Sequence, residues 1–183
     1  MKNLFIQFRL TIILLVLFCG IYPLAVYAIA QFAPNHGKGE TVSVDGKVVG
    51  YRRIGQRFNA FNYFWGRPSA VDYNAAGSAG SNKGPSNVEY LQQVQKRIDT
   101  FLIAHPYLKK SQVPSDMVTA SGSGLDPDIS AEAALVQVKR VAGARKLDES
   151  KVRQLVESKI YRPVIGTVTV NVLELNLALD ELK

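Results

Sequence analysis

The sequence is poor in the side chains from which catalytic and metal sites are usually built. Its 183 residues include one cysteine, Cys19, and two histidines, His36 and His105. A single cysteine excludes a disulfide within the chain, so cysteine usage does not identify the compartment. Neither histidine has Cys, Asp or Glu at the spacing of a metal site, and we interpret both as residues without a metal-binding role. We therefore expect no catalytic residue, no metal and no tightly bound cofactor.

Motifs for phosphate binding and nucleophilic catalysis are missing too. Residues 77–84 lack the Gly-Lys-Ser or Gly-Lys-Thr ending of a Walker A motif, and residues 77–80 are one residue short of a nucleophile elbow. No acidic residue precedes Glu40, so residues 34–183 hold all 15 Asp and Glu, against 20 Lys and Arg. This small positive excess is spread along the chain. It argues against a nucleic-acid-binding surface, which usually carries a denser basic face.

What the sequence does contain is one long apolar stretch, residues 10–33, without a charged side chain. As a helix it would be ~36 Å long, enough to cross a hydrocarbon core of ~30 Å. We expect a transmembrane helix over 10–33, with a local kink where Gly20 and Pro23 interrupt it. The residues that we assign to the membrane anchor are Leu10, Leu14, Leu17, Pro23 and Tyr27.

A cleaved signal peptide is the alternative interpretation of this stretch. Lys2 and Arg9 form a basic start, and Ala28-Ile29-Ala30 resembles a cleavage site, but the apolar run is longer than a signal peptide needs. Positive residues stay on the cytoplasmic side of a membrane. The flanking charges therefore predict that residues 1–9 are cytoplasmic and that the rest of the chain, after the span, lies outside.

Residues 34–183 are enough for one domain with its own core. We expect residues 34–65 to form a tether and a first strand near Val48–Ile54, and residues 66–183 to form a soluble C-terminal domain. Helical periodicity predicts helices over 88–104, from Ser130 to Ala144 and after Asp148, and a further helix at the C-terminus. Alternation over 164–172 predicts a strand. The fold class is α+β: one N-terminal transmembrane helix followed by a single small mixed α/β domain.

Two polar loops, residues 73–87 and 119–126, are too poor in apolar side chains to pack a core of their own. The first loop is either disordered or ordered by turns whose amides bind a partner. The first loop runs into the predicted capping box Ser86–Glu89, which is a weak signal for an anion site. Asp126 and Asp128 have the appearance of paired carboxylates, although turn formation explains them better. The candidate interface or nucleotide-proximal residues are Ser78, Gly80, Ser81, Asn82, Gly84, Ser86, Asn87, Ser121, Gly122, Ser123, Gly124 and Asp126.

At these loops the chain resembles a known family. The segments GRPSAVDYNAAGSAGSNKGPSN (66–87), VPSDMVTASGSGLDPDIS (113–130) and VNVLELNLALD (170–180), behind one N-terminal span, resemble the C subunit of the Kdp potassium-transporting ATPase. The resemblance implies a subunit of a bacterial inner-membrane complex. Its partners would be a channel-like A subunit that selects potassium, a P-type ATPase B subunit and a small F subunit.

The resemblance also implies a role without catalysis. Members of the family are described as catalytic chaperones that raise the affinity of the B subunit for ATP, and ATP would reach this chain only through that subunit. The predicted topology conflicts with direct contact, because ATP is cytoplasmic and the loops lie outside. Any effect on ATP would then travel through the membrane as a coupling free energy. The alternative is a membrane-anchored nucleotide-binding or hydrolytic enzyme that acts on its own, with Asp126 and Asp128 as its only candidate groups.

Overall fold

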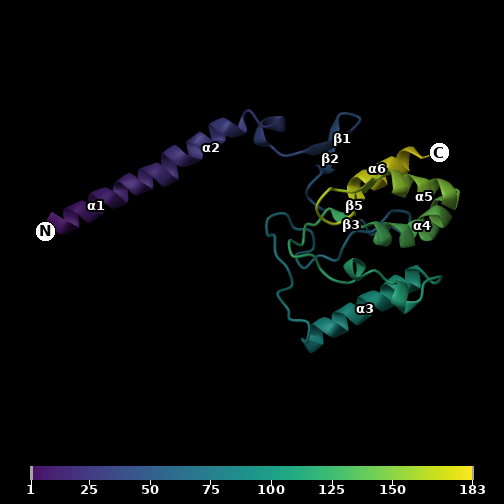
Figure 1. Ribbon diagram of the computed structural model, residues 1–183. Helices are drawn as coiled ribbons and strands as arrows, with labels where there is room; N and C mark the ends of the chain where they lie inside the picture. Colours follow the sequence, from purple (N-terminus) through teal and green to yellow (C-terminus); the bar gives the residue numbers. More distant parts are fainter. Residues whose placement is uncertain (1, 183) are drawn as a thin grey trace. The chain divides into compact units, whose positions relative to one another are not determined.

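The computed structural model describes residues 2–182, and the chain divides into two compact units at the junction of Thr41 and Val42. In the first unit, α1 (Lys2–Leu15), a π-helical segment η1 (Val16–Ile21) and α2 (Tyr22–Ala30) follow one another as one helical run (Figure 1). A short 3-10 helix, η2 (Pro34–Gly37), comes after it.

The helical run is apolar on every face. Among the described residues, one helix, Asn3–Ala30, is long and apolar enough to cross a membrane. Its most apolar 18-residue stretch has a mean hydropathy of 2.5, and none of that stretch is buried. The predicted anchor residues Leu10, Leu14, Leu17, Pro23 and Tyr27 all lie in it with exposed side chains. The π-helical turn ends two residues before Pro23. Proline has no N–H to donate to the preceding turn, and the wider π turn relieves that break, so the interruption at Gly20 and Pro23 takes this form.

The second unit begins with a hairpin of β1 (Thr41–Val44) and β2 (Lys47–Tyr51). Its turn residues Asp45 and Gly46 have φ values of 50° and 76°, which two-residue hairpin turns require. The sequence predicted only the second of these strands, as Val48–Ile54, and treated the first as part of the tether. β1 was missed because its short Thr-Val-Ser-Val sequence has no fully buried side chain, and only Val42 is half-buried.

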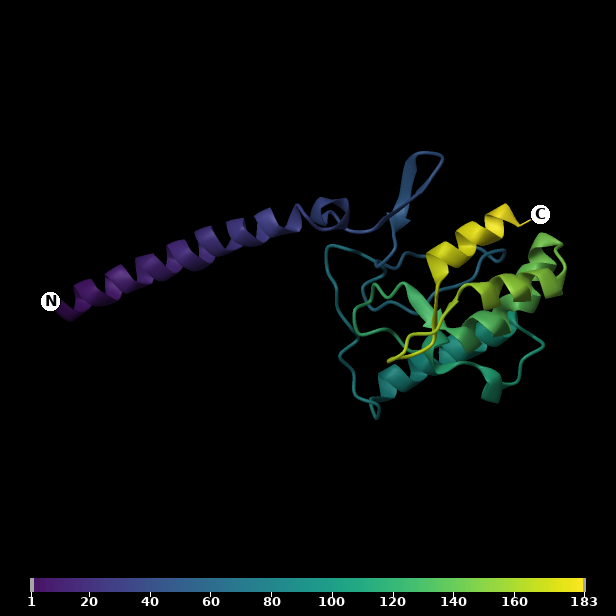
Figure 2. The same ribbon diagram turned by 45° about the horizontal axis from the view of Figure 1, so that its top comes forward.

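The remaining helices and strands build the core. They are α3 (Val88–Ala104), the 3-10 turns η3 (Lys110–Gln112) and η4 (Ser115–Met117), β3 (Asp128–Ser130), α4 (Ala131–Arg145), α5 (Glu149–Ser158), β4 (Ile160–Tyr161), β5 (Thr169–Asn171) and α6 (Val172–Glu181). β5 is the middle strand of an antiparallel sheet, with Ile129 of β3 and Ile160 of β4 both opposite Val170. α4, α5 and α6 gather around this sheet, and α3 lies lower in the view (Figures 1 and 2). The expected α+β class is confirmed.

Helix starts agree with the sequence in two places and differ in one. The Ser130 and Asp148 side chains accept hydrogen bonds from the amides of Ala133 and Ser150, as predicted for N-caps of α4 and α5. The capping box Ser86–Glu89 was wrong. Asn87 caps α3 by accepting from the amide of Tyr90, and Glu89 pairs with Lys83 instead.

In the aromatic segment 58–65, Phe58, Tyr63 and Trp65 pack against the core, whereas Phe61 is exposed. The Phe64 ring is fully buried. The Asn176 amide from α6 bonds both the N–H and the C=O of Phe64, at 2.8 and 3.0 Å, and Gln137 from α4 does the same for Trp65, at 2.8 and 3.2 Å. Two side-chain amides thus satisfy backbone groups that a neighbouring strand would otherwise satisfy.

Candidate interaction site: two interlocked loops

The two polar loops predicted from the sequence lie against each other. The Ser78 hydroxyl donates to the carbonyl of Ser123 at 2.9 Å. The carbonyl of Gly122 lies where a Cβ on Gly80 would come within 3.1 Å of it. Residues 45 positions apart in the chain therefore form one surface, and close packing is possible because small side chains face each other.

Ser69, which the sequence analysis did not select, holds this surface together. Its hydroxyl donates to the carbonyl of Gly124 at 2.6 Å and accepts from the amides of Val71 and Tyr73 at 3.2 and 2.9 Å. The Tyr73 hydroxyl in turn donates to the carbonyl of Arg67 at 2.5 Å, and burial raises the pKa of Tyr73 above its usual range. A single serine carries no sequence signal for this role, because the acceptor of its hydroxyl, the carbonyl of Gly124, lies in a distant loop.

The 119–126 loop is also closed by its own side chains. The Ser121 hydroxyl, which is buried, accepts from the amide of Gly124 at 2.9 Å, and the Ser123 hydroxyl accepts from the amide of Leu125 at 3.1 Å. The carbonyl of Leu125 accepts from the amide of Gly55 at 2.7 Å. The 119–126 loop is therefore ordered by turns.

The carboxylates of Asp126 and Asp128 have different surroundings. Asp126 forms an ion pair with Arg67 at 2.8 Å and also accepts from the backbone amide of Asp128 at 3.1 Å, which is a turn geometry. Both line a cavity of about 480 Å³ that also contains Asp116 and Glu132. Burial, and secondarily the charge of Asp126, raise the pKa of Asp128. The bond to the Asp128 amide is the turn that the sequence predicted, whereas the ion pair of Asp126 with Arg67 was not predicted.

The structure brings together only part of the predicted site. Ser78 and Gly80 meet the second loop at Gly122 and Ser123. Asn82 has a left-handed backbone with φ of 53° and an exposed side chain, and Ser81 is half-buried. Gly84, Ser86 and Asn87 lie beyond the contact, at the start of α3. Ten of the twelve candidate residues therefore fall into an interlocked group (Ser78, Gly80, Ser121, Gly122, Ser123, Gly124 and Asp126) and a helix-start group (Gly84, Ser86 and Asn87), and Ser81 and Asn82 lie between the two groups in the chain.

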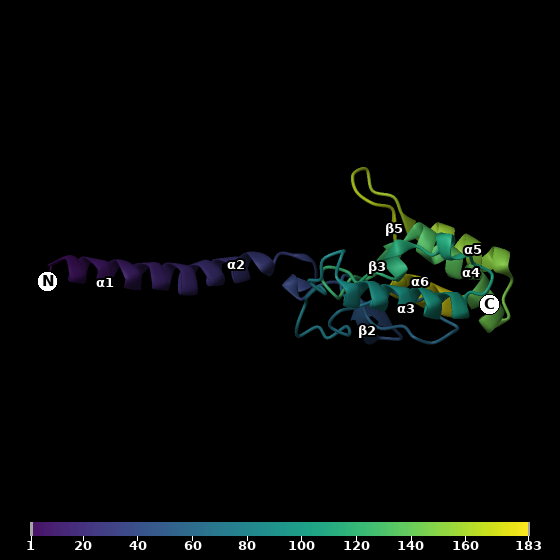
Figure 3. The same ribbon diagram turned by 90° about the horizontal axis from the view of Figure 1, so that it is seen from below.

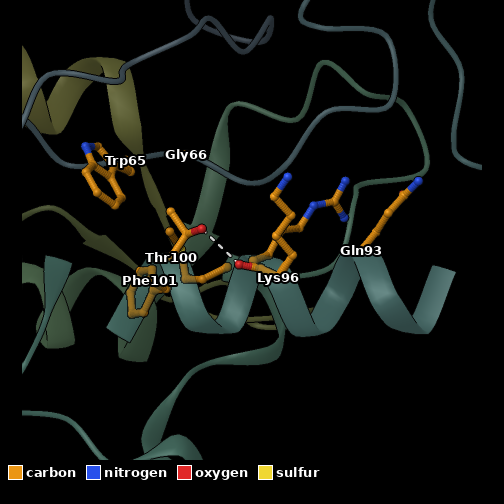
Figure 4. A pocket seen from close by; sticks show the side chains of 8 residues that line it. Trp65, Gly66, Gln93, Lys96, Thr100 and Phe101 are labelled. Carbon is orange, nitrogen blue, oxygen red and sulfur yellow. Dashed lines mark hydrogen bonds between the residues drawn. The ribbon is translucent and has the colours of Figure 1, made fainter. Parts of the chain in front are cut away.

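The sequence did not predict a groove that lies along α3. It has a volume of about 320 Å³ and lies between α3 and the segment around Trp65 and Gly66, with Phe101 and Met117 as apolar lining. Figure 4 shows Gln93, Lys96 and Thr100 on α3, on the side that faces Trp65 and Gly66. The Arg97 guanidinium, at the same wall, donates to the carbonyl of Val118 at 3.1 Å. The groove thus combines an apolar floor with a basic rim.

Comparison with known families identifies the chain. The family profile described as the c chain of the K⁺-transporting ATPase, KdpC, matches residues 4–181. The chain belongs to the KdpC family. The match includes the apolar helix as well as the second unit, so both are part of the KdpC pattern. The resemblance drawn from residues 66–87, 113–130 and 170–180 is confirmed.

Relatives from three bacteria agree with the KdpC assignment. A "Potassium-transporting ATPase KdpC subunit" from Flavobacterium johnsoniae is 71% identical over 183 residues and covers 100% of both chains. Proteins of the same name from Bacteroides fragilis and Caldanaerobacter subterraneus are 52% and 45% identical, covering 100% and 94% of this chain and 99% and 92% of their own. This KdpC-family chain is a subunit of a potassium-transporting ATPase complex, and this assignment together with its one apolar helix indicates a single-pass membrane protein.

Proposed function

We propose that the chain is a non-catalytic accessory subunit of a high-affinity, ATP-driven potassium import complex. The observation that carries this proposal is how the polar loops use their hydrogen-bonding groups. The hydroxyls of Ser69, Ser78, Ser121 and Ser123 are bonded to loop backbone, and Asp126 is paired with Arg67. Firm polar loops on a rigid scaffold are suited to docking on other proteins. The rival function is hydrolysis by Asp126 and Asp128. It is not supported, because Asp126 is already held in an ion pair with Arg67.

The proposed partners are a channel-like A subunit, a P-type ATPase B subunit and a small F subunit in the bacterial inner membrane. The span would pack beside the A subunit, and the second unit would lie outside the cytoplasm and act near the potassium entrance. A cysteine at Ser81 in a Cys19→Ser background should then react with an impermeant maleimide in intact spheroplasts. Labelling only after lysis would place the domain in the cytoplasm.

On this proposal the subunit raises the ATP affinity of the B subunit as a catalytic chaperone. With the second unit outside, the effect must be a coupling between two states of the complex, and such couplings are ~1–3 kcal/mol, about 5–150-fold in affinity. The loops would bind one conformational state of the A subunit more tightly than the other and so stabilise that state.

Reconstitution tests this role. The A, B and F subunits are purified with and without this chain, and ATP hydrolysis is measured against ATP concentration. We expect the KM for ATP to rise about 5-fold or more without the chain, and we expect no steady phosphate release by the chain alone. Steady turnover by the isolated chain would support the enzyme instead. An unchanged KM in a complete complex would refute the chaperone role.

A further inference from the structure

The loop that joins β4 to β5, residues 162–168, exposes apolar side chains without a covering element in the described chain. Val164 and Ile165 have exposed fractions of 102% and 91%, and the neighbouring Tyr161 is 66% exposed. Figure 3 shows this loop projecting away from the helices before it returns to β5. Scattered exposed aliphatic residues are ordinary, but two adjacent ones fully exposed at a projecting tip form a site for contact with an apolar surface.

The local backbone makes this tip a fixed feature of the fold. β4 has two residues and β5 has three, so the ladder ends before the tip. Pro163 cannot donate to a ladder, and Gly166, with φ of 120°, turns the chain back. The strand predicted over 164–172 therefore covers only 169–171, and Val164 and Ile165 are placed outside the sheet instead of within it.

The residues around the tip have the composition of a membrane interface. From 158 to 173 the chain contains Lys159 and Arg162 and no Asp or Glu. Both basic side chains are exposed, and Tyr161 lies between them. Basic side chains attract anionic headgroups, and tyrosine favours the headgroup level of a bilayer. A cluster of aliphatic, aromatic and basic residues is the pattern by which peripheral segments enter that region.

The covalent anchor makes the bilayer the favoured occupant. Residues 31–40 join α2 to β1, and ten residues span at most ~35 Å. The second unit therefore stays close to a membrane surface, and a weak contact is strengthened by the high effective concentration of lipid. This holds on either side of the bilayer, so it does not depend on the proposed orientation.

We propose that the β4–β5 tip is a second membrane contact of this chain. Val164 and Ile165 enter the boundary between headgroups and acyl chains, and Lys159 and Arg162 lie against anionic phospholipid headgroups. This contact goes beyond the proposed function, because it fixes the second unit against the lipid surface independently of any subunit.

Spin labelling of the full chain tests the contact. A nitroxide is attached to a cysteine at Ile165 in the Cys19→Ser background, and the chain is reconstituted alone in phosphatidylcholine–phosphatidylglycerol vesicles. Oxygen concentrates among acyl chains, whereas a polar nickel chelate stays in water. We expect the label at 165 to be more accessible to oxygen than to the chelate. The control is the same label at Asp45, an exposed turn residue nearer the anchor in sequence, where the chelate should be preferred.

Two further arms distinguish lipid from protein. Arg162→Glu in the labelled chain, or vesicles of phosphatidylcholine alone, should abolish the oxygen preference at 165 and leave the Asp45 label unchanged. Preference for the chelate at both positions in vesicles would overturn the proposal. So would protection at 165 that appears only after the other pump subunits are added, because the tip would then dock on protein.

Discussion

Gly124 determines, at the scale of one residue, whether the two polar loops can pack together. Its φ is 67°, and a Cβ there would lie 2.7 Å from the carbonyl oxygen of Ala79 and 2.6 Å from the side chain of Val71. Gly122, two residues earlier, has nothing within 4 Å of such a Cβ. The same substitution should therefore destabilise the protein at Gly124 and have little effect at Gly122.

We expect Gly124→Ala to lower the free energy of unfolding by ~1–3 kcal/mol, since a non-glycine residue in the left-handed region is strained and here also meets backbone. Gly122→Ala should change it by less than ~0.5 kcal/mol. Denaturant unfolding of the detergent-solubilised chain, followed by the fluorescence of its single tryptophan, Trp65, measures both. Equal stabilities of the two variants would mean that the loops do not interlock in solution.

The sequence could select these glycines as loop residues but could not rank them. Composition marks 73–87 and 119–126 as turn-rich, and it is local information. Which glycine is crowded depends on Ala79 and Val71, which lie about 45 to 53 positions away in the chain. Ser69 was missed for the same reason, because its acceptor is the carbonyl of Gly124. Sequence patterns show what a loop is made of, whereas the packing partners of a loop are set by the fold.

At the scale of elements, α3 is an exposed helix that depends on its ends. Its 17 residues include one buried side chain, Phe101, near the C-terminal end. The N-terminal end is held by Asn87 rather than by Ser86, which the sequence favoured. A serine and an asparagine are both good caps, and which one is used depends on where the preceding turn stops, since the amide of Asn87 already bonds the carbonyl of Gly84.

Removing the cap should loosen the first turns of α3. We expect Asn87→Ala to cost ~1 kcal/mol and to speed amide hydrogen exchange over about the first two turns, while Ser86→Ala leaves exchange unchanged. Mass-resolved exchange on the full chain measures this with local resolution. Faster exchange in Ser86→Ala than in Asn87→Ala would restore the capping box that the sequence suggested.

Helices were easier to predict than strands in this chain. The bounds of α3 follow directly from apolar spacing, because each helix forms its own hydrogen bonds. The strand predicted over 164–172 covers only 169–171 in the structure, because a strand needs a neighbouring strand to bond with and β4 has only two residues. The ordered backbone of Phe64 and Trp65 was missed because its partners are the side chains of Asn176 and Gln137, which no strand pattern reveals.

At the scale of the whole second unit, Arg140 joins parts that are far apart in the sequence. Its exposed fraction is 4%, and it donates to the carbonyls of Phe61 and Tyr63 and to the side chain of Gln137. Its Nε also donates to Nε2 of His105 at 2.9 Å, at the end of α3. One cation therefore links the aromatic segment, α3 and α4, so the charge state of His105 bears on the stability of the whole unit.

His105 must be neutral to hold this arrangement. Its Nδ1 lies 2.8 Å from the carbonyl of Phe101, to which it donates, which leaves Nε2 as the acceptor for Arg140. Protonation would put an N–H against the guanidinium. Burial, opposed by the bond to Phe101 and assisted by the charge of Arg140, lowers the pKa of His105 from 6.5 to about 4. The unfolded chain therefore binds a proton at a higher pH than the folded chain does, and stability must fall as the pH falls between these two values.

We expect the contribution of His105 to be complete above pH ~6.5 and to decline by up to ~1.4 kcal/mol per pH unit toward pH ~4. Denaturant unfolding at a series of pH values measures the slope, and His105→Gln isolates it, because glutamine can still accept from Arg140 but does not titrate. The difference between the wild-type and His105→Gln free energies should shrink or reverse on acidification. His36→Gln, at the exposed histidine of the first unit, should keep the wild-type slope. Parallel curves for wild type and His105→Gln would show that the buried histidine is not the acid-sensitive group.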